Sequence, residues 1–317
     1  MAGISVAPPL PPVLLPAGIE DLTERVTIDY QRDHLGASTL SDVHYGYLNG
    51  GEATNVAVKL IRIYPHQQRE KYQRRFAREA TIWSTLNHQN VHPLLGIINW
   101  NNYTQRPGLV SSLAQRIGLL AYVENMDMMN KHLILLGFAK GLEYLHNNNV
   151  VHGDVKPVSL ESIFYDCDMA NNSQGNILIS NEGIPKICDF GLSRCVDIDS
   201  HHTFTRYRMT HAHTAPEILD ILFRNDAENE EIDTLAINTK ESDVYAFSIT
   251  AAEILMGRGY RIGNALSDAW TQRVLSGYRP EVNSLAHLEI LGNCWCHDPA
   301  DRLKMRDVVR LLSALTI

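Results

Sequence analysis

Hydrophobic and polar positions divide the chain into a first part with the pattern of strands and a second part with the pattern of helices. Residues 26–63 contain short runs that favour strands, of which Val56-Ala57-Val58 is the clearest, and Asn49-Gly50-Gly51 is typical of a hairpin turn. From about Arg69 the apolar positions recur with a helical period. The pattern predicts a small group of strands followed by one helix.

One carboxylate interrupts the apolar stripe of that helix. Phe76, Glu79, Trp83 and Leu86 are spaced at i, i+3, i+7 and i+10, which places them on one helix face. A buried carboxylate needs a partner, because water no longer solvates its charge. Glu79 could instead lie at the edge of the helix, but that interpretation leaves an acid among apolar residues without a reason.

Helices dominate from about residue 130. The charged and poorly patterned stretch Arg224–Lys240 is expected to be a loop, and the junction between the two parts is expected near Pro107–Ala114. Three helices are predicted. The first has an apolar face of Leu135, Phe138, Leu142 and Leu145 and ends at Asn147-Asn148-Asn149, and the second, residues 243–256, is apolar nearly all round and capped by Gly257. The third covers about residues 305–315 and has an apolar stripe of Val308, Leu311, Leu312 and Leu315.

Length and charge limit the classes of protein to consider. The chain has 317 residues, and single cores stop growing at roughly 250–300 residues, so two lobes or one large domain with a tail are expected. Hydrophobic residues make up 44% and charged residues 20%, which excludes wholesale disorder. The 28 basic and 36 acidic residues give a net charge of −8. Nucleic acid and anionic membrane need a basic surface, so neither is expected as the main partner.

The cysteines and the N-terminus favour a cytoplasmic protein. Five cysteines with no regular spacing favour reduced thiols over a disulfide framework. Cys294, Cys296 and His297 could form part of a metal site, but no fourth ligand is placed. Residues 1–25 contain five prolines, before residue 17, and no basic leader, so an extended tail is expected. No apolar segment reaches the length of about 18 residues that a membrane helix requires.

Four short segments in a fixed order carry the chemistry. They are Val56-Ala57-Val58-Lys59, His152-Gly153-Asp154-Val155-Lys156-Pro157, Asp189-Phe190-Gly191 and Ala215-Pro216-Glu217. Together they resemble the signature set of protein kinases, and the chain is most similar to the tyrosine-kinase-like branch of the Ser/Thr kinases. The resemblance covers about residues 30–315. It implies an α+β, bilobal fold with a small antiparallel β lobe carrying one helix and a larger, mainly α-helical lobe.

The resemblance also implies domain limits and catalytic roles. The N-lobe would span about 26–110 and the C-lobe about 115–317, within a kinase domain of 26–317. Lys59 would hold the α- and β-phosphates of ATP and pair with Glu79. Asp154 would orient the substrate hydroxyl and accept its proton, and Lys156 resembles the lysine that marks Ser/Thr kinases. Asp189 and Asn176 would bind Mg²⁺, which prefers oxygen ligands.

The nucleotide site implied by the resemblance lies between the lobes and departs from the family pattern. Only Gly36 and Val43 survive from G-x-G-x-x-G-x-V, with Ser38 at the second glycine position. Val43, Ala57 and Leu178 would sandwich the adenine ring. Ser111 would be the gatekeeper, and Ser112-Leu113-Ala114 would offer hinge backbone groups.

Other matches are expected to be architectural. Glu217 and Arg302 resemble a buried ion pair, Asp243 resembles the aspartate that braces the catalytic loop, and Cys294-Trp295 belongs to a C-terminal family pattern that makes zinc unlikely. Thr210 resembles a threonine that lies near the catalytic aspartate. Gly153 replaces an arginine that normally meets a phosphate on the activation loop. We therefore expect activity to depend little on phosphorylation at Thr203 or Thr205.

The largest departure is a spacing anomaly. In the family the metal-binding asparagine follows the catalytic aspartate by five positions, whereas Asn176 follows Asp154 by 176 − 154 = 22. Removing residues 158–174 restores His-Gly-Asp-Val-Lys-Pro-Gly-Asn-Ile-Leu. Introns begin with GT and end with AG. Val158 is encoded by GTN, Gln174 can be encoded by CAG, and the 17 codons keep the reading frame, so this segment has the ends of an intron. The alternative is a genuine loop that returns Asn176 to the site.

The sequence favours an ATP- and Mg²⁺-dependent kinase that phosphorylates Ser or Thr on protein substrates. A pseudokinase that binds or scaffolds is the alternative, because Ser38 and the insert weaken the site. A small-molecule kinase is less favoured, because Ala215-Pro216-Glu217 and Thr210 resemble a platform for protein substrates. The substrate, the pathway and the oligomeric state have no signal in the sequence.

Overall fold

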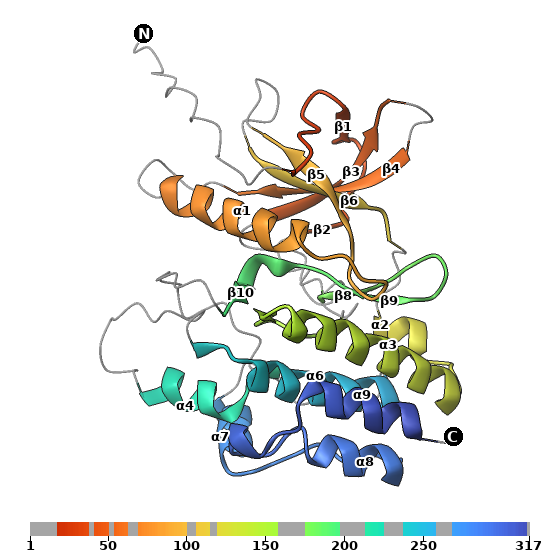
Figure 1. The fold of residues 1–317 in the computed structure, drawn as a ribbon, viewed down its shortest axis with the longest axis vertical. Coiled ribbons are helices and arrows are strands. Elements are labelled where there is room, and N and C mark those ends of the chain that lie inside the picture. The colour runs from red at the N-terminus through yellow and green to blue at the C-terminus, as the bar shows by residue number, and fades with distance from the viewer. Residues whose placement is uncertain are drawn as a thin grey trace. The chain divides into compact units, whose positions relative to one another are not determined.

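The chain separates into two compact units (Figure 1). The first unit holds the described residues up to Thr85 and those from Pro93 to Leu113, and the second holds Leu86–His92 and the described residues from Ala114 onward. The structure, a computed structural model, describes residues 18–37, 41–50, 54–62, 69–99, 106–114, 119–157, 175–196, 213–224, 237–257 and 268–315.

The first unit is built on an antiparallel sheet. Its strands run in the order β1-β3-β4-β6-β5, and β2 pairs with β3. The expected hairpin at Asn49-Gly50 joins β3 to β4, and Gly50 takes a φ of +133° that favours glycine. The strands are β1 (Val26–Asp29), β2 (Gly36–Ala37), β3 (Ser41–Leu48), β4 (Thr54–Ile61), β5 (Leu94–Ile98) and β6 (Gly108–Ser112).

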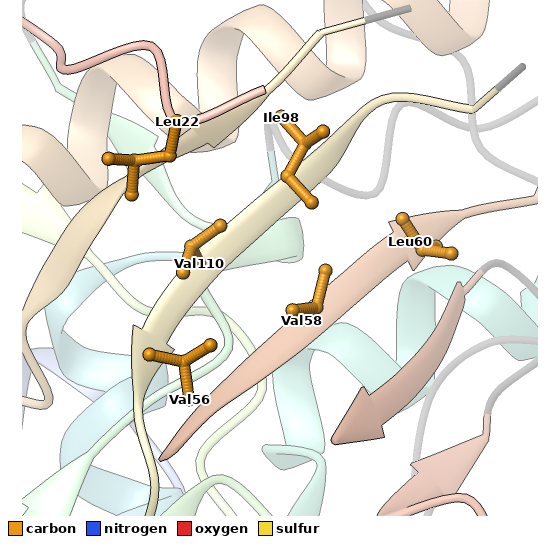
Figure 2. Packing of buried hydrophobic residues seen from close by; sticks show 6 residues of the cluster. All are labelled: Leu22, Val56, Val58, Leu60, Ile98 and Val110. Atoms are coloured by element: carbon orange, nitrogen blue, oxygen red, sulfur yellow. The ribbon is translucent and has the colours of Figure 1, made fainter. Parts of the chain in front are cut away.

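One face of this sheet is a hydrophobic core, whose side chains are drawn in Figure 2. The buried cluster consists of Leu22, Val56, Val58, Leu60, Ile98 and Val110. Leu22 precedes the first strand, and its backbone N–H donates to the Ile97 carbonyl at 2.7 Å. The segment before residue 26 was expected to be a tail, but its residues around Leu22 belong to the folded unit. The sequence does not reveal this contact, because Ile97, the partner of Leu22, lies far along the chain.

Helix α1 (Arg69–Ser84) packs through the predicted apolar stripe. Phe76, Glu79 and Trp83 are all buried, as the helical spacing predicted. The helix ends at Ser84, so Leu86 does not continue the stripe and instead lies in the second unit. Glu79 meets Lys59 of β4, and α1 therefore lies on the sheet face that carries Lys59.

The second unit is mainly helical. Two short antiparallel pairs, β7 with β10 and β8 with β9, accompany its helices. The helices are α2 (Leu119–Val123), α3 (Met128–Asn147), α4 (Pro216–Arg224), α6 (Lys240–Met256), α7 (Asp268–Leu275), α8 (Leu285–Gly292) and α9 (Met305–Ala314); the strands are β7 (Val150–Val151), β8 (Ile177–Ile179), β9 (Pro185–Ile187) and β10 (Arg194–Cys195). The 3₁₀ turns are η3 (Phe190–Leu192) and η7 (Pro299–Asp301).

Helix α6 is the buried helix that the sequence predicted. It begins three residues earlier than expected, because Thr239 caps it: the Thr239 hydroxyl accepts from Ser242 N at 3.1 Å. Gly257 ends it with a φ of +80°. Nearly all of its residues are buried, so it can anchor the loops that pack around it.

The boundary between the two units lies near the end of strand β6. The stretch Pro107–Ala114, expected as the junction, contains strand β6, and the division between the units falls inside this stretch, after Leu113. Ser112 belongs to this strand and pairs with Val56, which ties it into the sheet. Among the described residues, no helix combines the length and the apolar character needed to cross a membrane.

Candidate active site

Three strands of the first unit bring four of the predicted site residues to one face of the sheet. Val43 lies opposite Lys59 across β3 and β4, and Ala57 lies opposite Ser111 across β4 and β6. Directly paired residues point to the same face, and Ala57 and Lys59 are two positions apart on one strand. Gly36 pairs with Val43 at the start of the same surface. Together these residues form the nucleotide face, the term used below.

The predicted contact between Lys59 and Glu79 is present. Lys59 Nζ donates to Glu79 Oε1 at 2.6 Å, and the side chains are only 13% and 1% exposed. The lysine is thus held at a fixed place above the nucleotide face by a carboxylate from α1. This pairing gives the acid on the apolar helix stripe its partner.

In the second unit, Asp243 at the start of α6 holds the loop after β7. Asp243 Oδ2 accepts from His152 N at 2.7 Å, and Oδ1 accepts from Gly153 N at 2.9 Å. His152 Nδ1 accepts from Asp154 N, so Nε2 carries the proton and donates to the Cys188 carbonyl at 3.1 Å. The aspartate from the buried helix braces this loop, as the sequence led us to expect.

Asp154 is contacted by two of the residues predicted to act with it. Lys156 Nζ lies 2.9 Å from Asp154 Oδ2, and the Asn176 amide nitrogen donates to the same oxygen at 2.8 Å. Asn176 also donates to the Asp154 carbonyl. The asparagine therefore reaches the aspartate despite the 22 positions between them.

The backbone closes the same junction. Asn176 N donates to the Lys156 carbonyl at 2.9 Å. Pro157 and Gly175 flank this contact, and the anomalous segment 158–174 lies outside the described residues. If Pro157 were joined directly to Gly175, this hydrogen bond would link residues i and i+3 and close a β-turn. Proline followed by glycine is the sequence that a type II turn prefers.

Asp189 is connected to the same loop through the residue before it. Cys188 N donates to the Asn176 carbonyl at 2.9 Å, while the Cys188 carbonyl accepts from His152. Asp189 has a φ of +64°, which is uncommon for a residue with a side chain. Its carboxylate accepts from Gly191 N at 3.2 Å, which caps the turn η3. Two hydrogen bonds thus place the backbone before Asp189 beside Asn176 and His152.

The expected architectural pair is also present. The two terminal nitrogens of the Arg302 guanidinium, Nη1 and Nη2, donate to Glu217 at 2.8 and 2.6 Å, and the arginine side chain is fully buried. Burial raises the pKa of the Cys294 thiol to about 12, and its sulfur donates to the Ile290 carbonyl. Cys294 therefore stays protonated at neutral pH.

Comparison with known proteins places this arrangement in a family. A family model described as "Protein kinase domain" matches residues 30–311. The chain belongs to the protein kinase domain family. Its fold, a β-sheet unit with one helix followed by a helical unit, is that of the family.

Curated relatives of this kinase domain are longer proteins. The chain is 26% identical to serine/threonine-protein kinase STY17 of Arabidopsis thaliana, an alignment that covers 95% of this chain and 48% of that protein. It is 27% identical to protein kinase STUNTED of the same plant, over 75% of this chain and 33% of that protein. It is also 26% identical to a probable LRR receptor-like serine/threonine-protein kinase of Arabidopsis thaliana, over 88% of this chain and 28% of that protein. The chain spans about half or less of the length of these relatives.

The remaining predicted residues of the kinase domain fall in several places. Leu178 lies half-buried on β8 in the second unit, and Leu113 and Ala114 follow β6. Ser38, Thr203, Thr205 and Thr210 lie outside the described residues. The roles of all these residues stay predictions.

The sequence did not predict what surrounds Gly153. Gly153 has a φ of +77°, and a Cβ there would lie 2.7 Å from Asn238 Nδ2 and 2.8 Å from the Leu192 carbonyl. Asn238 donates to the Gly153 carbonyl, and Arg194 donates to the Asn238 carbonyl at 2.8 Å. Glycine therefore fits the loop in a way that a residue with a side chain does not. Only the departure from His-Arg-Asp marked this position in the sequence.

Proposed function

We propose that this chain is an active protein kinase that transfers the γ-phosphate of ATP to Ser or Thr on protein substrates. One observation carries the proposal: Asp154 is held by both Lys156 and Asn176, although the chain places Asn176 far from its expected position. The arrangement supports catalysis, because it brings Asn176 onto a carboxylate that lies 22 positions earlier in the chain.

The residues present fit ATP and Mg²⁺. Asn176 donates twice through its amide nitrogen, which leaves the amide oxygen as a ligand of the type that Mg²⁺ prefers, and Asp189 adds a carboxylate. Lys59 offers a buried positive charge for phosphate oxygens. When bound, Mg-ATP supplies the phosphoryl group, and its metal neutralises the charge that develops during transfer.

The side chains then have separate tasks. Lys59 orients the phosphates, and Glu79 keeps Lys59 in place through their 2.6 Å contact. Asp154 orients the substrate hydroxyl and takes its proton, while Lys156 stabilises negative charge beside that carboxylate. Asp243 keeps the loop rigid, so that the orientation of Asp154 does not have to be established during the reaction.

Substrate class and location rest on the sequence. Lys156 and Thr210 resemble residues of Ser/Thr kinases, and two of the relatives, STY17 and the LRR receptor-like kinase, are named as serine/threonine-protein kinases. We propose protein substrates for the same reason. We also propose a cytoplasmic location, because no regular framework of disulfides is visible in the cysteine spacing.

We further propose that residues 158–174 are not needed for the fold or for catalysis. The contact between Lys156 O and Asn176 N already has the geometry that a Pro157-Gly175 turn would close. The ends of the segment match the ends of an intron in frame, which favours an unspliced intron over an evolved insert. Sequencing of mature transcripts decides this point: if every message retains the 17 codons, the intron hypothesis is wrong.

The activity is tested with two versions of the chain, one complete and one lacking residues 158–174. We expect both to show a thermal shift with Mg-ATP, and we expect the shorter one to transfer radiolabelled phosphate to a Ser/Thr protein substrate at the higher rate. Asp154→Asn is the matched control and should bind Mg-ATP without transferring phosphate. Binding without transfer in the shorter version would instead support the pseudokinase, which the loss of the glycine at Ser38 favours.

Regulation follows from Gly153. The arginine that would meet a loop phosphate is absent, and Asn238 occupies the space beside the glycine. We propose that alanine and phosphomimetic changes at Thr203 and Thr205 alter the rate of transfer by less than about twofold, because the arginine that would read a phosphate there is absent. A large difference between the two kinds of variant would contradict the proposal.

A further inference from the structure

A cluster of three charged residues lies at one corner of the first unit, and no role given above uses it. Asp42, near the start of β3, has a side chain that is only 8% exposed. Arg62 Nε donates to its Oδ1 at 2.9 Å, and Arg106 Nη2 donates to its Oδ2 at 2.8 Å. We call Asp42, Arg62 and Arg106 the strand clamp.

The strand clamp is charged despite its burial. Burial alone would raise the pKa of Asp42, but hydrogen bonds from Arg62 and Arg106 and the charges of the two guanidinium groups outweigh it, and the pKa is lowered. Asp42 is therefore an ionised carboxylate with both oxygens bound. Paired charges of this kind give little net stability, because their desolvation offsets their attraction, and they are best explained by the geometry they impose.

Arg106 extends the clamp across the sheet. Its Nε donates to the Ile61 carbonyl at 2.9 Å and its Nη2 to the Leu60 carbonyl at 3.0 Å. Leu60 and Ile61 end strand β4, and Arg106 itself stands just before β6. One guanidinium thus joins the start of β3, the end of β4 and the approach to β6.

The clamp acts on the backbone that presents the nucleotide face. Asp42 is the neighbour of Val43, and Leu60 is the neighbour of Lys59, so the clamped residues lie on the opposite face of the same strands. Rotation or sliding of either strand would move Val43 or Lys59. These two residues therefore depend on how firmly this corner is held.

We propose that Asp42 is a positioning residue for nucleotide binding, acting through the strand clamp on Val43 and Lys59. The inference rests on the proposed function, because it assumes that the nucleotide face binds Mg-ATP. Ser38 and Ser41 stand where the family has its second and third glycines, so this chain lacks two positions at which bare backbone covers phosphate. The strand clamp instead holds β3 and β4, the strands that carry Val43 and Lys59, in a fixed arrangement.

The test measures Mg-ATP affinity in Asp42→Asn and Arg106→Met. Asp42→Asn keeps the shape of the side chain but removes its charge. We expect the Kd for Mg-ATP and the KM for ATP to rise about tenfold, with kcat at saturating ATP within about twofold of the unchanged chain, because loosened strands weaken binding of the nucleotide equally in the ground state and in the transition state. The KM for the protein substrate should not change.

The matched control is Asp29→Asn. Asp29 lies on the neighbouring strand β1 and also accepts from two partners, the Tyr47 hydroxyl and Gln31 N, both at 3.1 Å. It touches neither arginine of the clamp, and its variant should keep the Kd for Mg-ATP. Asp42→Glu should recover part of the lost affinity, because its carboxylate can still reach a guanidinium.

Amide hydrogen exchange separates failure of the clamp from failure of the proposed function. In Asp42→Asn we expect faster exchange in residues 41–48 and 54–61, and we expect Asp29→Asn to leave residues 54–61 unchanged. If the unchanged chain shows no thermal shift with Mg-ATP, the proposed function is wrong, and the exchange result still decides whether the clamp orders these strands. A lower melting temperature in Asp42→Asn, with unchanged Mg-ATP affinity and unchanged exchange in β4, would overturn the inference.

Discussion

At the scale of single residues, Lys59 and Glu79 form a buried ion pair that contributes to the stability of the first unit. Glu79 is fully buried, and Lys59 is the cation placed 2.6 Å from its carboxylate. Removal of one partner from a buried pair leaves an uncompensated charge, which costs more than the pair contributes. The two residues therefore cannot be probed independently of stability.

Lys59→Met should lower the free energy of unfolding by on the order of 3 kcal/mol, because it strands the buried Glu79 carboxylate. The double variant Lys59→Met with Glu79→Leu should recover much of that lost stability. Neither the single nor the double variant should transfer phosphate. Urea denaturation of the three chains checks this. A double variant less stable than Lys59→Met would show that Glu79 has another compensating partner.

Gly153 offers a second test at the scale of one residue. Gly153→Ala should destabilise the protein by more than about 1–2 kcal/mol, because a left-handed backbone conformation disfavours a side chain and the new Cβ meets Asn238 and Leu192. Gly277→Ala is the matched control, since Gly277 has a φ of +92° and nothing within 4 Å of a Cβ. Thermal denaturation of both variants isolates the effect of crowding. Equal losses of stability in the two variants would mean that the loop around Gly153 shifts to make room for the new Cβ.

At the scale of elements, helices α3 and α8 meet through two buried histidines. His132 Nδ1 lies 3.0 Å from His287 Nε2, and the Ser284 hydroxyl lies 2.7 Å from His287 Nδ1. Burial, with a smaller effect of His132, lowers the pKa of His287 to about 4. Burial also lowers the pKa of His132. Both rings are therefore neutral in the folded protein near pH 7.

This contact predicts a loss of stability in acid. Between pH 6.5 and about 4 the unfolded chain takes up protons that the folded His287 does not, so the folded state is favoured above pH 6.5 and progressively less favoured below it. We expect His287→Gln to reduce the difference in unfolding free energy between pH 7 and pH 5 by on the order of 1–2 kcal/mol. Urea titrations at the two pH values check this, and an unchanged difference would contradict the origin we assign.

The elements also show which features a sequence can reveal. Helix α6 was predictable because its residues are apolar all round and Gly257 ends it, and the partner of Glu79 was predictable because an acid stood on an apolar stripe. The strand clamp was not. Arg62 and Arg106 are 20 and 64 positions from Asp42, and no local periodicity connects them. The end of α1 before Leu86 was missed because the apolar pattern continues beyond the helix.

At the scale of the whole molecule, the folded region begins earlier than its motifs indicate. The Ile97 N–H donates to the Glu20 carbonyl at 2.9 Å, and Asn99 N donates to the Thr23 hydroxyl at 2.8 Å. Leu22 fills the core between these contacts. The segment therefore acts as part of the first unit, although it carries no kinase motif.

A chain that starts at residue 26 should thus be less stable than one that starts at residue 18. We expect Leu22→Ala in the longer chain to cost about 2–4 kcal/mol, as is usual when a buried leucine is truncated, and the shorter chain to lose more. Melting temperatures and denaturant midpoints of the three proteins check the order. Equal stability of the two lengths would show that the segment only rests on the sheet.

The backbone hydrogen bond from Asn176 N to the Lys156 carbonyl has a practical consequence for protein engineering. Asn176 N donates to the Lys156 carbonyl at 2.9 Å, and Pro157 and Gly175 are the last and first described residues on the two sides of residues 158–174. Foreign sequence of similar length can be exchanged there without separating Asp154 from Asn176.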